Sequence, residues 1–199
     1  MEEIIELIRE NYPIILEVIG LILGLCYLYY EYKASKWVWL FAILMPMISL
    51  YVYYHRGIYA DFGINIYYLI TAIYGFVVWS IGGKSGSGVR ITHASKTVKW
   101  VCGAIALVLW AAIYYILVNF TDSNVPVPDA FTTSLSMVGS WMLARKYVEQ
   151  WLVWVVVDVV SVGLFIYKGI YPYALLYSIY SVIALLGYRK WKKLMLTQA

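Results

Sequence analysis

The chain has 199 residues, of which 63% are hydrophobic and only 13% are charged, whereas soluble domains are about 45–50% apolar and about 25% charged. A water-soluble fold could not bury so many apolar side chains, so the composition excludes a soluble protein and indicates a single transmembrane domain over residues 1–199. The 15 Lys and Arg exceed the 11 Asp and Glu by only four, too few to suggest a nucleic-acid partner.

Seven apolar stretches follow one another, each near the length of about 20 residues that a membrane-spanning helix needs. The fifth carries many hydroxyl groups, which is typical of a helix that faces other helices or a polar cavity. The stretches are Ile14–Tyr30, Trp37–Tyr54, Ile58–Ile81, Val98–Phe120, Ala130–Ala144, Trp151–Tyr167 and Tyr171–Tyr188.

Basic residues gather on one side of this predicted topology. The N-terminal side holds Arg9, Arg56 and Lys168, and the acidic start of the chain predicts no cleaved leader. By the positive-inside rule the N-terminus is expected outside and the C-terminus in the cytoplasm. The cytoplasmic side would then hold Lys33, Lys36, Lys84, Arg90, Lys96, Lys99, Arg145, Lys146, Arg189, Lys190, Lys192 and Lys193.

An internal repeat appears when the chain is shifted by 112 residues. The shift aligns Gly57-Ile58-Tyr59 with Gly169-Ile170-Tyr171, and it aligns Gly75 with Gly187 and Trp79 with Trp191. We therefore expect an all-α fold of seven helices in a 3+1+3 arrangement, with repeats at about 14–81 and 130–191 and a linker helix at about 98–120. Both halves would have the same orientation, as in SWEET-type sugar transporters, whose substrate site lies between the halves.

One face of the sixth stretch combines Trp151, Trp154, Asp158, Ser161 and Phe165 at helical spacing. A carboxylate at this depth costs at least about 2.5 kcal/mol unless it faces water or a partner. Asp158 is therefore either a functional residue or a hydrogen-bond partner of a hydroxyl group on a neighbouring helix.

Further candidate residues lie on the third, fifth and seventh stretches. Asn65 and Tyr68 face the same way on the third, and Tyr177 and Tyr180 occupy the equivalent face of the seventh. Thr132 and Ser136 belong to a hydroxyl stripe that either contacts a ligand or ties helices together. The tyrosines could equally serve packing, and Trp79 and Trp191 are expected to be aromatic anchors at the cytoplasmic surface.

Aromatic rings around a carboxylate and an amide suit a flat, polar, cationic heteroaromatic ligand. The sequence shows no catalytic set, metal-ligand spacing or nucleotide-binding motif, and Cys26 and Cys102 fit small core residues. We therefore expect no enzyme, no metal and no cofactor. A passive or ion-coupled carrier fits best, and a membrane scaffold or sensor is the alternative.

Several segments closely resemble the PnuC family of vitamin transporters. The later half matches through Trp141-Met142-Leu143-Ala144-Arg145-Lys146, Trp151-Leu152-Val153-Trp154 with Asp158, and Gly187-Tyr188-Arg189-Lys190-Trp191. The earlier half matches through the segment from Gly57 to Asn65, with Tyr68, Tyr74-Gly75 and Trp79.

This resemblance implies a homotrimer in a bacterial inner membrane that lets a vitamin without phosphate cross by facilitated diffusion, a cytoplasmic vitamin kinase then trapping it. It also implies that Trp151, Trp154 and the amide-bearing face of the third stretch line the site. The nicotinamide riboside branch typically has Gln at the position of Asn65, and the segments Ile91-Thr92-His93 and Phe120-Thr121-Asp122-Ser123 resemble the thiamine branch. We therefore expect thiamine, with nicotinamide riboside as the alternative.

Overall fold

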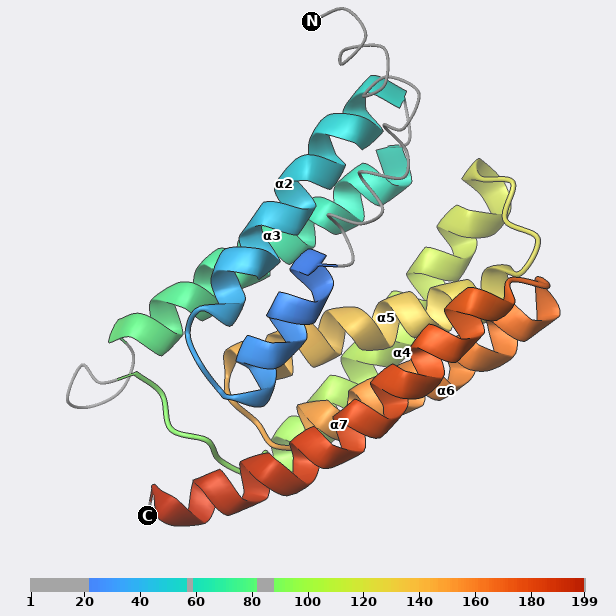
Figure 1. The fold of residues 1–199 in the computed structure, drawn as a ribbon. Coiled ribbons are helices and arrows are strands. Elements are labelled where there is room, and N and C mark those ends of the chain that lie inside the picture. The colour runs from blue at the N-terminus through green and yellow to red at the C-terminus, as the bar shows by residue number, and fades with distance from the viewer. Residues whose placement is uncertain (1–21, 57–58, 82–87, 199) are drawn as a thin grey trace, which may run out of the picture. The chain divides into compact units, whose positions relative to one another are not determined.

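The computed structural model describes residues 22–56, 59–81 and 88–198, which are helical apart from their connections and one β-bridge between Thr92 and Tyr147. Residues 22–32 are helical, and six complete helices follow them (Figure 1). These helices are α2 (Val38–Arg56), α3 (Tyr59–Ile81), α4 (Lys96–Phe120), α5 (Pro126–Ala144), α6 (Gln150–Tyr167) and α7 (Tyr171–Thr197).

The predicted helices match the observed ones closely except at two ends. Helix α5 begins at Pro126 rather than Ala130, because proline with its fixed φ suits the first turn of a helix. Helix α7 runs nine residues past the predicted end at Tyr188, to Thr197. The added segment is rich in Lys and Arg, which are good helix formers, so the loss of apolar character there does not end the helix.

Five of the complete helices, namely α2, α3, α4, α6 and α7, contain a segment long and apolar enough to cross a membrane. Helix α5 has 19 residues but does not qualify, since Thr132, Thr133, Ser134, Ser136 and Ser140 lower its apolar character. Of the predicted first stretch, residues 14–21 lie outside the described part of the chain. The structure thus establishes an all-helical, multi-pass architecture, while the 3+1+3 repeat and the single domain stay predictions.

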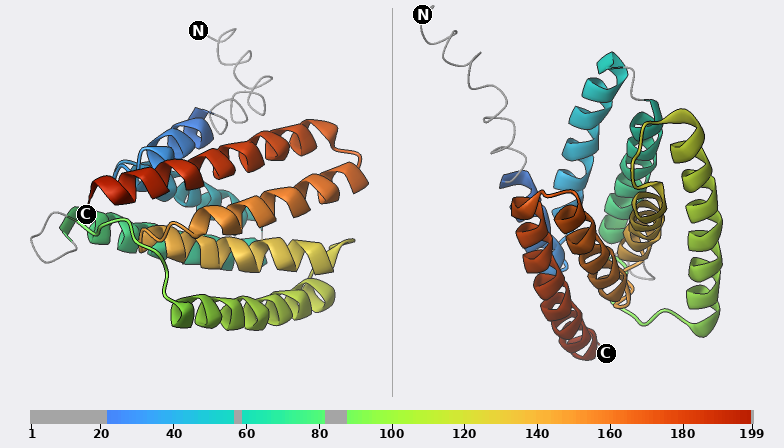
Figure 2. Two further views of the ribbon diagram at one scale, coloured as in Figure 1. Left: turned by 90° about the horizontal axis from the view of Figure 1, so that it is seen from below. Right: turned by 90° about the vertical axis from the view of Figure 1, so that its right-hand side faces the viewer.

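The chain forms two compact units, one up to Leu69 and one from Ile70 onward, so the second half of α3 belongs to the second unit. In this unit α4 packs on α5, α5 on α6 and α6 on α7 (Figure 2). At one end of the unit lie the start of α4, the turn between α5 and α6, and the end of α7. We call it the basic end, because among the described Lys and Arg of the unit only Lys168 is at the opposite end.

Backbone and side-chain contacts fix the α5–α6 turn at the basic end. The N–H of Thr92 donates to Lys146 O at 3.2 Å, and the N–H of Val148 donates to Thr92 O at 3.0 Å. The carboxylate of Glu149 accepts from Ala94 N–H at 2.9 Å and pairs with Lys99 at 2.8 Å and with His93 at 3.0 Å.

These contacts also set the charge of Glu149. Burial acts to raise the pKa of its carboxyl, but the hydrogen bond from Ala94 and the contacts with Lys99 and His93 outweigh burial, so the pKa lies below its ordinary value. Glu149 therefore stays ionised and holds the connection before α4 against the α5–α6 turn.

Candidate functional site

The predicted face of α6 lies inside the second unit. Trp151 is 1% exposed, and Asp158 and Ser161 are each 5% exposed. Trp154 and Phe165 on the same face are half-buried. The helical periodicity of the sequence therefore identified the packed side of α6 correctly.

Asp158 lies opposite two tyrosines of α7. Tyr177 and Tyr180 both interact electrostatically with its carboxylate. Their rings are 5.7 Å apart, and the Tyr177 ring is 5.2 Å from that of Phe165. Within the described residues Asp158 accepts no hydrogen bond, so the structure provides no example of the helix-to-helix hydrogen bond considered as its structural role. A buried carboxylate beside three aromatic rings is suited to a cationic, flat ligand.

Trp154 extends the same region toward α5. Gly139 of α5 faces its indole, and a Cβ atom added to that glycine would lie 3.6 Å from the ring. The Nε1 of Trp154 is buried and donates to no other residue in the described part of the chain. A buried indole N–H normally finds an acceptor. Trp154 therefore offers a ligand both a ring and a hydrogen-bond donor, four residues before Asp158 on the same face of α6.

Trp151 belongs to a different set of contacts, toward the basic end. Its ring meets that of Trp191 edge-on at 5.7 Å, and the ring of Trp191 is 6.1 Å from that of Trp79. We call Trp79, Trp151 and Trp191 the tryptophan cluster. Gly187 permits the packing, since a Cβ there would come within 2.7 Å of the Trp151 ring.

The prediction that Trp79 and Trp191 are surface anchors is wrong, because they are 4% and 0% exposed. A tryptophan near a helix end can pack inward or outward, and its position in the sequence does not distinguish the two. Trp79 is also held by polar contacts: its Nε1 donates to Ala144 O at 3.0 Å, and the Lys146 ammonium lies 4.3 Å from its ring centroid. Burial lowers the pKa of Lys146 to about 8.

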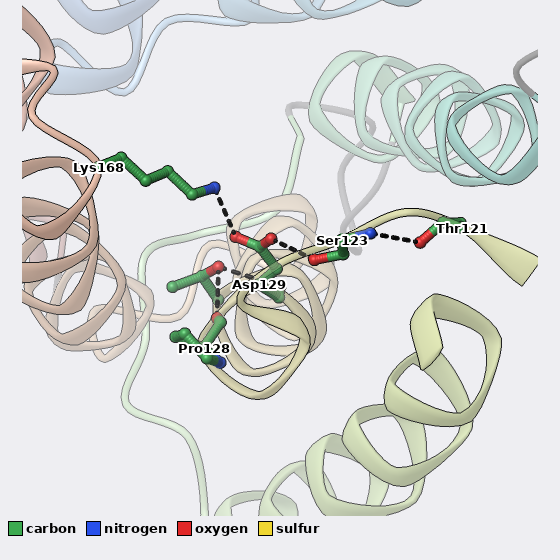
Figure 3. A network of polar contacts seen from close by, with 6 residues as sticks. Thr121, Ser123, Pro128, Asp129 and Lys168 are labelled. Carbon is green, nitrogen blue, oxygen red and sulfur yellow. Dashed lines mark hydrogen bonds and ion pairs between the residues drawn. The ribbon is translucent and has the colours of Figure 1, made fainter. Parts of the chain in front are cut away.

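Among the predicted hydroxyl residues of α5, Thr132 lies at the end opposite the basic one. Its Oγ1 donates to the carbonyl oxygens of Pro128 and Asp129 at 3.0 and 3.1 Å. The Asp129 carboxylate accepts from Ser123 at 3.0 Å and pairs with Lys168 at 3.5 Å (Figure 3). Thr132 therefore satisfies its own helix backbone beside a network that joins α5 to the end of α6.

Ser136 is half-buried in the middle of α5, and its carbonyl oxygen accepts from the Ser140 hydroxyl at 2.8 Å. Asn65 and Tyr68 are half-buried on α3, where the Tyr68 ring meets that of Tyr67 edge-on at 5.7 Å. Asn65 and Tyr68 belong to the first unit, so their contribution to the site stays a prediction.

Sequence reasoning missed two residues of this region. Gln150 is fully buried, and both polar atoms of its amide lack partners in the described part of the chain. Its spacing of four residues from Trp154 and eight from Asp158 could have placed it on the same face. Gly139 gave no signal, because the partner helix that requires a small residue is unknown until the helices are paired. The described residues contain no group of three metal-ligating side chains.

Apolar helices long enough to span a membrane, together with a carboxylate buried among aromatic rings, define the class as a multi-pass membrane protein. A family model described as "Nicotinamide mononucleotide transporter" matches residues 14–193. The chain therefore belongs to the nicotinamide mononucleotide transporter family. It is a membrane transporter and not an enzyme, and its resemblance to the PnuC family is confirmed.

Two relatives and one solved structure illustrate the match. The chain is 27% identical over 165 residues to the nicotinamide riboside transporter PnuC of Escherichia coli strain K12, covering 70% of this chain and 69% of that protein. It is 26% identical over 180 residues to the riboflavin/roseoflavin transporter RibM of Streptomyces davaonensis, covering 88% and 83%. A crystal structure of the vitamin B3 transporter PnuC shares the fold, with a TM-score of 0.72 at 21% identity, covering 97% of this chain and 87% of that one.

Proposed function

We propose that this protein carries a flat, cationic vitamin without phosphate across a bacterial membrane, and that nicotinamide riboside is the first candidate. The observation that carries the proposal is the buried Asp158 carboxylate beside Tyr177 and Tyr180, on the same helix face as the indole N–H of Trp154, which has no acceptor among the described residues. This set offers a counter-charge, aromatic faces and, about one turn of α6 away, a hydrogen-bond donor.

The chemistry of nicotinamide riboside fits each of these groups. Its pyridinium ring carries the positive charge that a buried carboxylate attracts, and the ring is flat enough to stack on Trp154 or a tyrosine. Its ribose hydroxyls accept and donate hydrogen bonds, so one of them supplies the acceptor that Trp154 Nε1 lacks. A ligand cation also relieves the free-energy cost of an ionised Asp158 in the membrane.

The choice among vitamins rests on charge and on the relatives. The relatives reported above are named for nicotinamide riboside and riboflavin, and none is named for thiamine. Riboflavin is uncharged, so it makes less use of Asp158 than a cation does. Thiamine, which the sequence alone favoured, is also a flat cation, so it is the competitor that a binding experiment must include.

The remaining features of the proposal follow the family resemblance. We expect facilitated diffusion, since the sequence holds no nucleotide-binding motif to power a pump. We also expect a homotrimer of 3+1+3 protomers with the C-terminus in the cytoplasm. A cytoplasmic vitamin kinase would trap the transported vitamin by phosphorylating it. The site would be formed by Trp151, Trp154, Asp158, Asn65, Tyr68, Tyr177, Tyr180, Thr132 and Ser136.

The test compares nicotinamide riboside, thiamine and riboflavin side by side, first in binding to the purified protein and then in uptake by liposomes. Nicotinamide riboside should bind most tightly and should equilibrate without an ion gradient. Preferential binding of thiamine or riboflavin would assign the carrier to that vitamin instead. Accumulation that requires a proton or sodium gradient would contradict facilitated diffusion, and the absence of any counterflow would favour a scaffold or sensor.

A further inference from the structure

The tryptophan cluster closes the basic end of the second unit with residues from three helices. Trp79 ends α3, Trp151 begins α6 and Trp191 lies in the last third of α7. We propose that this cluster is the inner barrier of the transport path, which must open before a bound vitamin can leave toward the cytoplasm. The inference rests on the proposed function, because a barrier has a role only where a path exists.

The packing of the cluster is dense enough to exclude a ligand. The three indoles are between 0% and 4% exposed, and Gly187 has no room for a methyl group against Trp151. Centroid distances of 5.7 and 6.1 Å are those of rings in direct contact. No solute of vitamin size passes these rings without separating the helices that carry them.

On both α6 and α7, the cluster lies between the candidate site and the basic end. On α6, Trp151 precedes Asp158 by seven residues, which is roughly 10 Å along the axis at a rise of about 1.5 Å per residue. On α7, Gly187 follows Tyr180 by the same number of residues. Both helices therefore place Asp158 and Tyr180 toward the membrane interior and the cluster toward the basic end, with Trp151 belonging both to the site and to the cluster.

The predicted internal repeat relates two members of the cluster to each other. Trp79 and Trp191 are equivalent under the shift of 112 residues, and their rings touch. Transporters built from repeats place their substrate sites between the repeats, so a contact between residues that are equivalent in the predicted repeat supports the assignment of the cluster to the transport path.

The polar contacts indicate which part moves. Trp79 is anchored to Ala144 O by its Nε1 and covered by the Lys146 ammonium. The Nε1 of Trp151, in contrast, has no partner in the described part of the chain. Breaking the contact between Trp79 and Trp191 therefore leaves Trp79 held, while α6 and α7, which pack closely on each other, can move as a pair with Trp151 and Trp191.

The experiment measures access to the site from each side of the membrane. In the full-length protein with Cys26→Ala and Cys102→Ala, a Tyr180→Cys reporter is labelled by a membrane-impermeant cationic thiol reagent in vesicles of known orientation. Adding Trp191→Ala should accelerate labelling about tenfold, and only from the side of the C-terminus, because the aromatic contact with Trp79 that holds the closed state is lost. Trp100→Ala is the matched control, since Trp100 is 82% exposed near the start of α4.

Trp191→Phe serves where the alanine variant does not fold, and it should accelerate labelling less than alanine but more than the control. Equal labelling rates in folded cluster variants and in the Trp100→Ala control would overturn the barrier, as would acceleration from the opposite side. Labelling needs no vitamin, so this result is separate from the proposed function. A protein that transports nicotinamide riboside but labels equally retains the function and loses the barrier.

Discussion

The indole rings of Trp79 and Trp191 are 6.1 Å apart although 112 residues separate them in the chain. The same interval relates Gly75 to Gly187 and aligns the Gly-Ile-Tyr segments of the two halves. Two residues that correspond in the predicted repeat thus meet in space. Gly187 on α7 leaves room for the ring of Trp151, which packs against Trp191.

Gly187→Ala should destabilise the protein by about 1–3 kcal/mol, because an inserted methyl group in a packed core forces side chains out of their rotamers. The new Cβ would come within 2.7 Å of the Trp151 ring. Thermal unfolding in detergent measures the change. Gly163→Ala on α6 is the matched control, since a Cβ there meets no atom within 4 Å. A Gly187→Ala variant as stable as Gly163→Ala would contradict the packing described.

Asp158→Asn should weaken binding of nicotinamide riboside and of thiamine about tenfold or more, because the amide keeps the shape and loses the negative charge. Binding of uncharged riboflavin should change much less. Titration calorimetry of the purified protein with the three vitamins measures the difference. Asp129→Asn is the control for the loss of a carboxylate elsewhere, since Asp129 pairs with Lys168 at the end of the second unit opposite the basic end. An equal loss for all three vitamins would show that Asp158 shapes the site and does not select charge.

The sequence predicted the helices and the inner face of α6 because both follow from local patterns. Apolar length sets a spanning helix, and the 3.6-residue period sets its buried side, so Asp158 and Ser161 were correctly placed. The inward packing of Trp79 and Trp191 depends on which helices are neighbours, and no local pattern carries that information. Local patterns also could not reveal that Gly139 lies opposite Trp154. Nor could they reveal the three partners of Glu149, which lie in α4 and in the connection before it, more than 45 residues earlier in the chain.

Glu149→Gln should destabilise the basic end by about 1 kcal/mol near neutral pH, since the amide still accepts from Ala94 but no longer pairs with Lys99. The pKa of Glu149 is below its ordinary value of 4.5, so the stability it contributes is present above that value and is lost as the pH falls through the lowered pKa.

Melting temperatures across acidic pH should therefore fall less steeply for Glu149→Gln than for the parent protein. Asp122→Asn, which removes a carboxylate that forms no ion pair in the described residues, should leave the steepness unchanged. Identical acid profiles for Glu149→Gln and the parent would contradict the assigned role of Glu149.

Lys146 should titrate near pH 8 in the folded protein, because burial against Trp79 disfavours its charge and lowers its pKa to about 8. The lowered pKa means that the folded state releases this proton at a lower pH than the unfolded state does. Unfolding therefore takes up a proton between about pH 8 and the ordinary value of 10.5, and stability rises with pH over that interval.

Lys146→Met keeps the apolar stem without the charge, so it should be more stable than the parent at pH 7 and should lose this rise. Tryptophan fluorescence should show a transition near pH 8 in the parent, because Lys146 lies over the Trp79 ring. The transition should be absent from Lys146→Met and present in Lys99→Met, since Lys99 pairs with Glu149 instead. A transition that persists in Lys146→Met would assign the titration to another group.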